Sequence, residues 1–216
     1  MEIKDISGEL EAVSEKIRVA LGDKDGAREK CLKDCRDIIR LSSTSIRAIH
    51  RREKEKAAEL ISETERLVRK TQKDLSKLHP DLLSANYIHD SFKEYAEASI
   101  TFAVIFERSI PDPDRLRVAY PAYLNGLAES VGEMRRFVLD SLRSHEFSVA
   151  EELLAIMDHI YTVLVTMDFP DAITYGLRRN TDSVRGIIEK TRGDLTLLIN
   201  NDLLQKKISL LERKIR

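Results

Sequence analysis

Residues 27–79 read AREKCLKDCRDIIRLSSTSIRAIHRREKEKAAELISETERLVRKTQKDLSKLH and contain neither glycine nor proline. A segment without these two helix-breaking residues favours a long α-helix. As one helix it would extend about 80 Å at a rise of about 1.5 Å per residue, which exceeds the size of a compact domain. Apolar periodicity lapses in the wholly charged run 51–56 and resumes at Leu60. We therefore expect a helical hairpin over residues 27–79 that turns within this run.

The composition of the whole chain is typical of long helices with solvated faces. Charged residues make up 34% of the 216 residues, whereas the chain has eight glycines, five prolines and no tryptophan. Hydrophobic residues make up 42%, which is enough to build one core. We therefore expect an all-α fold, in which residues 1–216 form a single-domain bundle of about seven helices.

The segments on either side of the hairpin also have helical patterns. In residues 1–26, apolar positions recur every three or four residues up to Leu21 and predict an N-terminal helix. We expect this helix to end at the turn cluster 22–26, which contains two glycines. Pro80 ends the hairpin because proline disrupts a helix interior. Residues 80–216 then hold the remaining helices.

Proline and glycine divide this C-terminal part of the chain. The run Ser109-Ile-Pro-Asp-Pro-Asp114 predicts a loop, because two prolines cannot both lie in a helix interior. Ser148 and Glu151 have the spacing of a capping box and predict the start of a helix. The expected helices span residues 81–108, 121–142, 148–166, a short segment from 171, and 181–214, with Asn86 and Gly193 as candidate bend sites.

The sequence has no membrane-spanning or secretory signal. No run approaches the roughly 18 consecutive apolar residues that a membrane span requires. The first ten residues, MEIKDISGEL, have neither the apolar core nor the basic leader of a signal peptide. We therefore expect a cytoplasmic protein without membrane contact.

The two cysteines, Cys31 and Cys35, are four residues apart in the hairpin. Two thiols without matching cysteine or histidine elsewhere make neither a disulfide framework nor a zinc site. We interpret them as reduced packing residues, with a redox role as the alternative.

Charge is distributed unevenly along the chain. The formal net charge of -1 argues against a protein that holds nucleic acid through overall positive charge. Residues 27–79 contain 15 Lys and Arg against 9 Asp and Glu, a sum of +6, so the remaining residues must sum to -7. This asymmetry predicts a basic surface on the hairpin and acidic groups gathered elsewhere.

A stripe of polar residues interrupts an otherwise apolar helix over residues 92–106. Asp90, Glu94, Glu97 and Thr101 are spaced four, three and four residues apart, so they share one helix face. Two ionised carboxylates at positions i and i+3 repel each other, and their burial is costly without a partner. A bound cation would resolve both problems. His89 and Asp90 lie about one turn before Glu94 and could orient such ligands.

The helix predicted at 121–142 repeats this feature, because Glu129 and Glu133 are i, i+4 neighbours. If the two stripes face each other, four carboxylates converge. Ligands that offer only oxygen select hard divalent ions such as Mg²⁺ or Mn²⁺. The alternative remains open at this point, since paired glutamates on a helix also mark a solvated face or partners for arginine.

Two segments carry a resemblance to a known family. Residues 88–105 read IHDSFKEYAEASITFAVI, and residues 121–136 read PAYLNGLAESVGEMRR. The second resembles the translin/TRAX signature Y-L-x-G-[LV]-x-[DE]-x-x-G-E-x-x-R, and the first resembles the polar helix of that family. The similarity covers roughly the C-terminal two thirds of the chain.

The resemblance implies a function for the carboxylates. TRAX-type subunits have an E-x-x-E pair in the first segment and D-x-x-x-E in the second, which hold the metal of an RNA-cutting complex. Glu94 and Glu97 match the first pair, which translin-type subunits lack. Glu129 and Glu133 match the second, with Glu129 in place of the usual aspartate. The resemblance thus implies a TRAX-like, metal-dependent endoribonuclease acting on single-stranded RNA, with these four glutamates as catalytic metal ligands.

The resemblance also implies an assembly. Family members form a hollow eight-subunit particle with the active sites facing its interior. This chain is similar to a prokaryotic or archaeal-type homologue that supplies every subunit, which implies a homo-octamer.

Arginines could hold the RNA. Four of them lie on one face of the first half of the hairpin, and three lie near the second glutamate pair: Arg36, Arg40, Arg47 and Arg51, then Arg135, Arg136 and Arg143. Such stripes suit the tracking of phosphates. The alternative for each arginine is an i, i+4 ion pair with a neighbouring acid.

Two other functions remain compatible with the sequence. One is a non-catalytic, translin-like scaffold that binds RNA or single-stranded DNA. The other is a helical interaction module that pairs with a partner through apolar positions of the last helix. These positions are Leu203, Leu204, Ile208, Leu211 and Ile215.

Overall fold

A computed structural model describes residues 3–215, and this part of the chain contains α-helix and no β-strand. The all-α prediction is therefore confirmed. The helices are α1 (Ile3–His50), α2 (Lys54–Leu78), α3 (Asn86–Phe102), α4 (Pro113–Leu116), α5 (Tyr120–Arg143), α6 (Phe147–Val165), α7 (Asp171–Thr174) and α8 (Leu177–Ile215). A 3₁₀ segment (Pro80–Ser84) precedes α3, and a π-helical segment (Ala103–Glu107) follows it.

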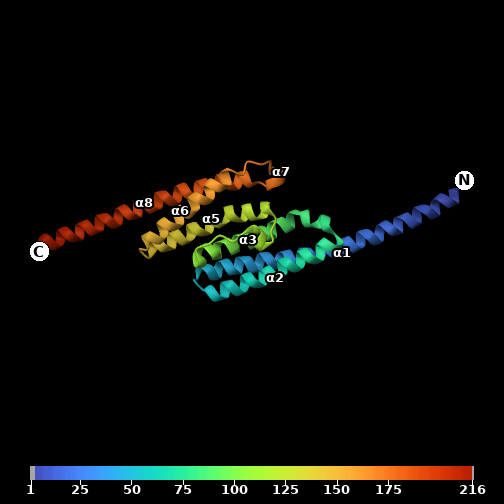
Figure 1. Cartoon of the computed structure of the whole chain (residues 1–216), viewed down its shortest axis with the longest axis horizontal. Helices are drawn as coiled ribbons and strands as arrows, with labels where there is room; N and C mark the ends of the chain where they lie inside the picture. Colours follow the sequence, from blue (N-terminus) through green and yellow to red (C-terminus); the bar gives the residue numbers. More distant parts are fainter. Residues whose placement is uncertain (1–2, 216) are drawn as a thin grey trace.

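Helices α3 and α5 form the centre of an elongated bundle (Figure 1). The α1–α2 hairpin packs on α3, and α6 and α8 pack on α5. The N-terminal part of α1 and the C-terminal part of α8 extend beyond the bundle at opposite ends (Figure 1). None of the helices in the described part of the chain combines the length and apolar character needed to span a membrane.

The predicted hairpin turn is confirmed. Helix α1 ends at His50 and α2 begins at Lys54, within the charged run 51–56. Arg52 has a left-handed backbone with a φ of 60°, and the N–H of Glu53 donates to the carbonyl of Ala48 at 3.0 Å. The turn is therefore tight, and it places the two halves of the hairpin side by side.

The predicted break at residues 22–26 is wrong, because α1 runs through it without interruption. Gly22 and Gly26 face open space, so each weakens the helix by only about 1 kcal/mol. The segment is also held from outside, since Lys24 forms an ion pair with Asp81 after the end of α2. The N-terminal helix and the first half of the hairpin are thus one element.

The remaining boundaries agree with the sequence in part. Helices α5 and α7 lie where they were predicted, whereas the helix predicted at 81–108 is divided into 3₁₀, α and π segments. The capping box at Ser148 is wrong, because α6 begins at Phe147 and its N-cap, Glu146, makes no side-chain cap bond. Helix α8 begins earlier than predicted, at Leu177, and continues through Gly193. The predicted loop is shortened by α4, whose first turn is capped by the Asp112 carboxylate.

Cys31 and Cys35 are both free and buried in the core, with their sulfur atoms 3.9 Å apart. The prediction that they are packing residues is confirmed, because both side chains are buried and neither forms a disulfide bond. They lie where α1 packs against the rest of the bundle.

The exposed apolar positions of the last helix lie on the extended part of α8. Leu203, Leu204, Ile208 and Leu211 are exposed, whereas the side chain of Ile215 lies outside the described residues. The extended part of α1 likewise exposes Leu10, Val13 and Ile17, and the side chain of Ile3 lies outside the described residues. Within the described residues, the extended parts of α1 and α8 therefore each present an exposed apolar stripe.

Helices α3 and α5 lie in close contact at Gly126. A Cβ atom built on Gly126 would lie 2.7 Å from the carbonyl oxygen of Lys93 and 2.9 Å from the backbone nitrogen of Glu97. Real Cβ atoms are essentially never this close to backbone atoms, so only glycine fits without a shift of one helix. This contact fixes the part of α3 that carries Lys93, Glu94 and Glu97 against α5.

We expect Gly126→Ala to lower the free energy of unfolding by about 1 to 3 kcal/mol, because the added methyl group pushes α3 and α5 apart. Gly132→Ala is the matched control on the same helix, since nothing lies within 4 Å of its Cβ position. The control should be neutral or stabilise the protein by up to about 1 kcal/mol, because alanine is the better helix former. Urea denaturation followed by circular dichroism measures both, and equal effects would contradict the close approach.

Candidate metal centre

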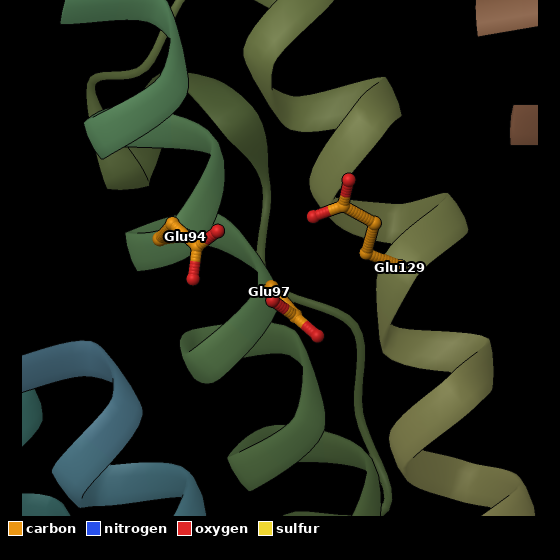
Figure 2. A group of neighbouring side chains, drawn as sticks. All are labelled: Glu94, Glu97 and Glu129. Carbon is orange, nitrogen blue, oxygen red and sulfur yellow. The ribbon is translucent and has the colours of Figure 1, made fainter. Parts of the chain in front are cut away.

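Three of the four glutamates converge between α3 and α5. Carboxylate oxygens of Glu94, Glu97 and Glu129 all lie within 4.8 Å of one another. Figure 2 shows Glu94 and Glu97 on α3 turned toward Glu129 on the facing helix. The spacing of three along α3 puts the first two carboxylates on adjacent turns, and the Gly126 contact brings α5 close enough for the third. We call Glu94, Glu97 and Glu129 the carboxylate cluster.

Glu133 lies outside the carboxylate cluster, contrary to the predicted convergence of four carboxylates. Its carboxylate pairs with Nε2 of His50, the last residue of α1. The His50 ring is held in turn by stacking on Phe137, with 4.8 Å between the ring centroids. Glu133 is nevertheless near enough for its charge to affect Glu97. His50 therefore fixes Glu133 beside the carboxylate cluster and ties it to α1.

Lys93 is the cation of the site. Its Nζ lies 2.8 Å from Oε1 of Glu129 and 3.8 Å from Oε1 of Glu94. The side chain is largely buried, so the ammonium group is a fixed countercharge rather than a solvated one. We did not predict this role from the sequence. The signal was present, since Lys93 precedes Glu94 and lies one turn before Glu97.

Burial, together with the charges of neighbouring carboxylates, raises the pKa of two glutamates in the carboxylate cluster. Burial raises the pKa of Glu97 from 4.5 to about 8, with further contributions from the charges of Glu94, Glu129 and Glu133, while Lys93 opposes the shift. Burial likewise raises the pKa of Glu94, with the charge of Lys93 acting in the opposite direction. Burial lowers the pKa of Lys93, but its bond to Glu129 and the surrounding carboxylates outweigh this and raise it overall. One cation therefore incompletely neutralises the site.

A cavity reaches the carboxylate cluster from the side of α8. It has a volume of about 290 Å³ and is lined by Glu97 and Glu129 together with Asn180, Ser183 and Ile187. Asn180 is itself positioned, because its side-chain amide donates to the Asn125 side chain at 2.8 Å. The cluster is thus accessible to a small ion or to part of a larger ligand.

His89 and Asp90, the two residues predicted to orient the metal ligands, differ in their relation to the carboxylate cluster. The ring of His89 stacks on Tyr175, with centroids 4.1 Å apart and an angle of 10° between the planes. Asp90 is exposed, and its charge contributes to the raised pKa of Glu94. Of the two, Asp90 acts on the cluster and only through its charge.

The predicted RNA-binding arginines fall into two groups. Arg135 binds α8, with its guanidinium donating to Thr191 and to Asp194 at 2.8 Å each, so its visible role is to hold two helices together. The others are exposed on α1, on the turn that follows it and on α5: Arg36, Arg40, Arg47, Arg51, Arg136 and Arg143. Three of these have local partners, at 3.3 Å between Arg40 and Asp37, 2.9 Å between Arg47 and Thr44, and 3.8 Å between Arg143 and Asp140. Their predicted contact with RNA stays a prediction.

Comparison with known proteins finds relatives in both sequence and structure. No family model matches the chain. An uncharacterized protein of Methanocaldococcus jannaschii is 30% identical over 190 residues, which cover 87% of this chain and 83% of that protein. The crystal structure of C3PO, a translin/TRAX protein, from Archaeoglobus is 31% identical and covers 88% of this chain and 98% of that one, with a TM-score of 0.77. The chain belongs to the translin/TRAX family.

Two further structures extend this comparison. A second structure of Archaeoglobus C3PO, in complex with duplex RNA, matches with a TM-score of 0.71 at 31% identity and covers 88% of this chain and 97% of that one. Apo C3PO from Nematostella is 21% identical and shares the fold, with a TM-score of 0.75 over 88% of this chain and 96% of that one. The family resemblance inferred from residues 88–105 and 121–136 is therefore confirmed. Assignment to the catalytic branch stays a prediction.

The raised pKa of Glu97 predicts a pH-dependent stability. Between pH 4.5 and about 8 the folded protein keeps a proton on Glu97 that the unfolded chain releases, so stability falls as pH rises through this window. At about 1.4 kcal/mol per pKa unit, the full loss is on the order of 5 kcal/mol.

The neutral isostere Glu97→Gln should lose this dependence, so that its advantage over wild type grows from pH 5 to pH 8. Urea denaturation in EDTA at several pH values measures the difference, and Glu151→Gln, at an exposed position on α6, is the control. Parallel pH profiles of wild type and Glu97→Gln would show that Glu97 ionises normally.

Proposed function

We propose that this chain is a metal-dependent endoribonuclease that hydrolyses phosphodiester bonds of single-stranded RNA at the carboxylate cluster. The observation that carries the proposal is the convergence of Glu94, Glu97 and Glu129 in a partly buried, accessible site. These residues match three of the four positions that the TRAX resemblance assigns to the metal. Glu133, held by His50, is the fourth and lies one turn along α5.

The residues present fit a hard divalent cation. The donor set consists only of carboxylate oxygens, which suits Mg²⁺ or Mn²⁺ rather than zinc. Three ionised carboxylates and one ammonium group have a net charge of about -2, which a divalent cation would balance. Glu94, Glu97 and Glu129 would hold the ion. When bound, such an ion supplies Lewis-acid stabilisation of charge on phosphodiester oxygens.

The chain's own residues would supply the proton transfer and the positioning. One of the glutamates would accept the proton from the attacking water. His50 keeps the Glu133 carboxylate oriented, and Asn180 and Ser183 line the side from which substrate reaches the carboxylate cluster. Lys93 holds the Glu129 carboxylate and would place its positive charge beside a phosphate oxygen at the carboxylate cluster.

RNA would bind through the exposed arginines. Arg36 on α1, Arg51 in the turn after α1, and Arg136 one turn beyond Glu133 on α5 lie outside local ion pairs among the described residues. The Archaeoglobus relative forms a complex with duplex RNA, which supports RNA as the ligand class of this chain. The apolar stripes at both ends of the molecule suit packing against further copies of the chain, in keeping with the homo-octamer that the resemblance implies.

Labelled single-stranded RNA incubated with Mg²⁺ or Mn²⁺ should be cleaved, and EDTA should stop the reaction. Glu97→Gln and Glu129→Gln should each lower the rate by at least about 100-fold, since loss of even an outer partner of a metal ligand typically costs 10- to 100-fold. Glu151→Gln is the matched control and should leave the rate unchanged, and duplex RNA serves as the comparison substrate. Salt-dependent RNA retention without cleavage would instead support the scaffold function.

Removal of Lys93 tests how the site is neutralised. Lys93→Met should raise the affinity for Mn²⁺ about tenfold, a difference of about 1.4 kcal/mol, because the ammonium no longer competes for Glu129. Lys70→Met, which breaks an ion pair with Asp34 elsewhere in the bundle, is the control and should change nothing. Electron paramagnetic resonance of free Mn²⁺ measures both, and unchanged or weaker binding by Lys93→Met would refute the competition.

A further inference from the structure

A second cavity lies between α2 and the N-terminal ends of α3 and α5. It has a volume of about 670 Å³, which is within the range of pockets that hold small ligands. Its lining includes the cations Arg69, Lys73 and Arg117 and no aspartate or glutamate. The cavity near the carboxylate cluster has the opposite character, since its charged lining residues are Glu97 and Glu129. The charge of the second cavity therefore favours an anionic ligand.

The three cations are not equivalent. The Arg69 guanidinium is occupied, because its Nε donates to Glu65 at 3.0 Å. Lys73 and Arg117 are exposed and form no ion pair within 4.0 Å with any residue in the range 6–214. The loop that carries Arg117 is anchored, since the side-chain amide of Gln72 on α2 donates to the Arg117 carbonyl. Two cations therefore border one cavity, and their charges are available to a ligand.

An aromatic surface lies on another side of the same cavity. His89 and Tyr175 both line it, and their rings stack in nearly parallel planes. Tyr175 is 40% exposed, so the stacked pair is not enclosed by the rest of the protein. A flat ring system with an open edge or face is the usual platform for a nucleobase, because every base has a face that can stack.

We propose that this cavity binds one nucleotide of an RNA strand, with its base against the His89–Tyr175 pair and its phosphate at Lys73 and Arg117. Cations alone would favour any anion, and aromatic rings alone would favour any planar apolar group. Their combination in one cavity selects a ligand that joins a planar ring to a phosphate.

The cavity is placed to serve the carboxylate cluster. His89 precedes Glu94 by five residues on α3, which is about 7.5 Å along the helix axis. Tyr175 precedes Asn180 by five residues, and Asn180 lines the other cavity, the one that reaches Glu97 and Glu129. A strand with one nucleotide in the second cavity would therefore run along α3 and α8 toward the carboxylates. This use as a substrate subsite rests on the proposed function, whereas nucleotide binding itself does not.

The test uses the full chain without divalent ions, so that it is independent of cleavage. Adenosine 5′-monophosphate, adenosine and inorganic phosphate are titrated separately by isothermal calorimetry at low salt. The monophosphate should bind at least about tenfold more tightly than either fragment, because it alone makes both the charged and the stacking contacts. Lys73→Gln and Arg117→Asn should each weaken monophosphate binding about fivefold or more and leave adenosine binding unchanged. Asparagine tolerates the left-handed backbone of Arg117, whose φ is 58°.

Tyr175→Asn should weaken both the monophosphate and adenosine, since it removes the stacking surface. Lys77→Gln, at an exposed position one turn further along α2, is the control and should behave like wild type. Thermal unfolding followed by circular dichroism checks that each variant is folded. Monophosphate binding no tighter than that of phosphate, or equal binding by Lys73→Gln and Lys77→Gln, would overturn the proposal. Monophosphate binding should be unchanged in Glu129→Gln. If the wild-type protein binds the monophosphate in this way but does not cut RNA, the result supports this cavity and refutes the nuclease.

Discussion

The contact of Gly126 with the backbone of α3 is the constraint on which the rest of the structure depends. Because the position has no side chain, α5 lies directly against the turn that holds Lys93, Ala96 and Glu97. The α1–α2 hairpin packs on the other side of α3, and α6 and α8 pack on α5. Every major element is therefore positioned, directly or through one neighbour, by the separation of two helices. The same separation sets the distances within the carboxylate cluster.

Close packing at this point has an electrostatic cost. It brings three carboxylates together in a partly buried site, and among the described residues Lys93 is the one cation paired with them. A well-packed apolar group would stabilise the fold more than this arrangement does, since buried charges are stable only when fully paired. Perturbed groups of this kind cluster at functional sites. The ion pair of Glu133 with His50 has a different character, because it satisfies one carboxylate and joins α1 to α5.

Features that depend on the periodicity of residues along a helix could be predicted from the sequence. Features that depend on contacts between residues far apart in the chain could not. The absence of glycine and proline from residues 27–79 indicated the hairpin, and the spacing of the glutamates indicated which residues share a helix face. Glycine in residues 22–26 predicted a break because the rule is local, whereas the helix is held by packing and by Lys24. Spacing also cannot show that His50 lies across from Glu133, since the residues are 83 positions apart. Lys93 was overlooked because lysine beside glutamate is normally a solvated pair.

The charge of the carboxylate cluster links two kinds of ligand. In the proposed function, the carboxylates would repel RNA phosphates until a cation is present, and the cation would in turn bind better when phosphate oxygens approach. Such mutual dependence is a coupling free energy that acts equally in both directions. The chain has a formal net charge of -1, so it cannot attract RNA by charge alone. Attraction must then come from local cations such as Arg36, Arg136, Lys73 and Arg117, all of which are exposed. In the proposed function, these cations would hold a strand nearby before a divalent ion lets it reach the carboxylates.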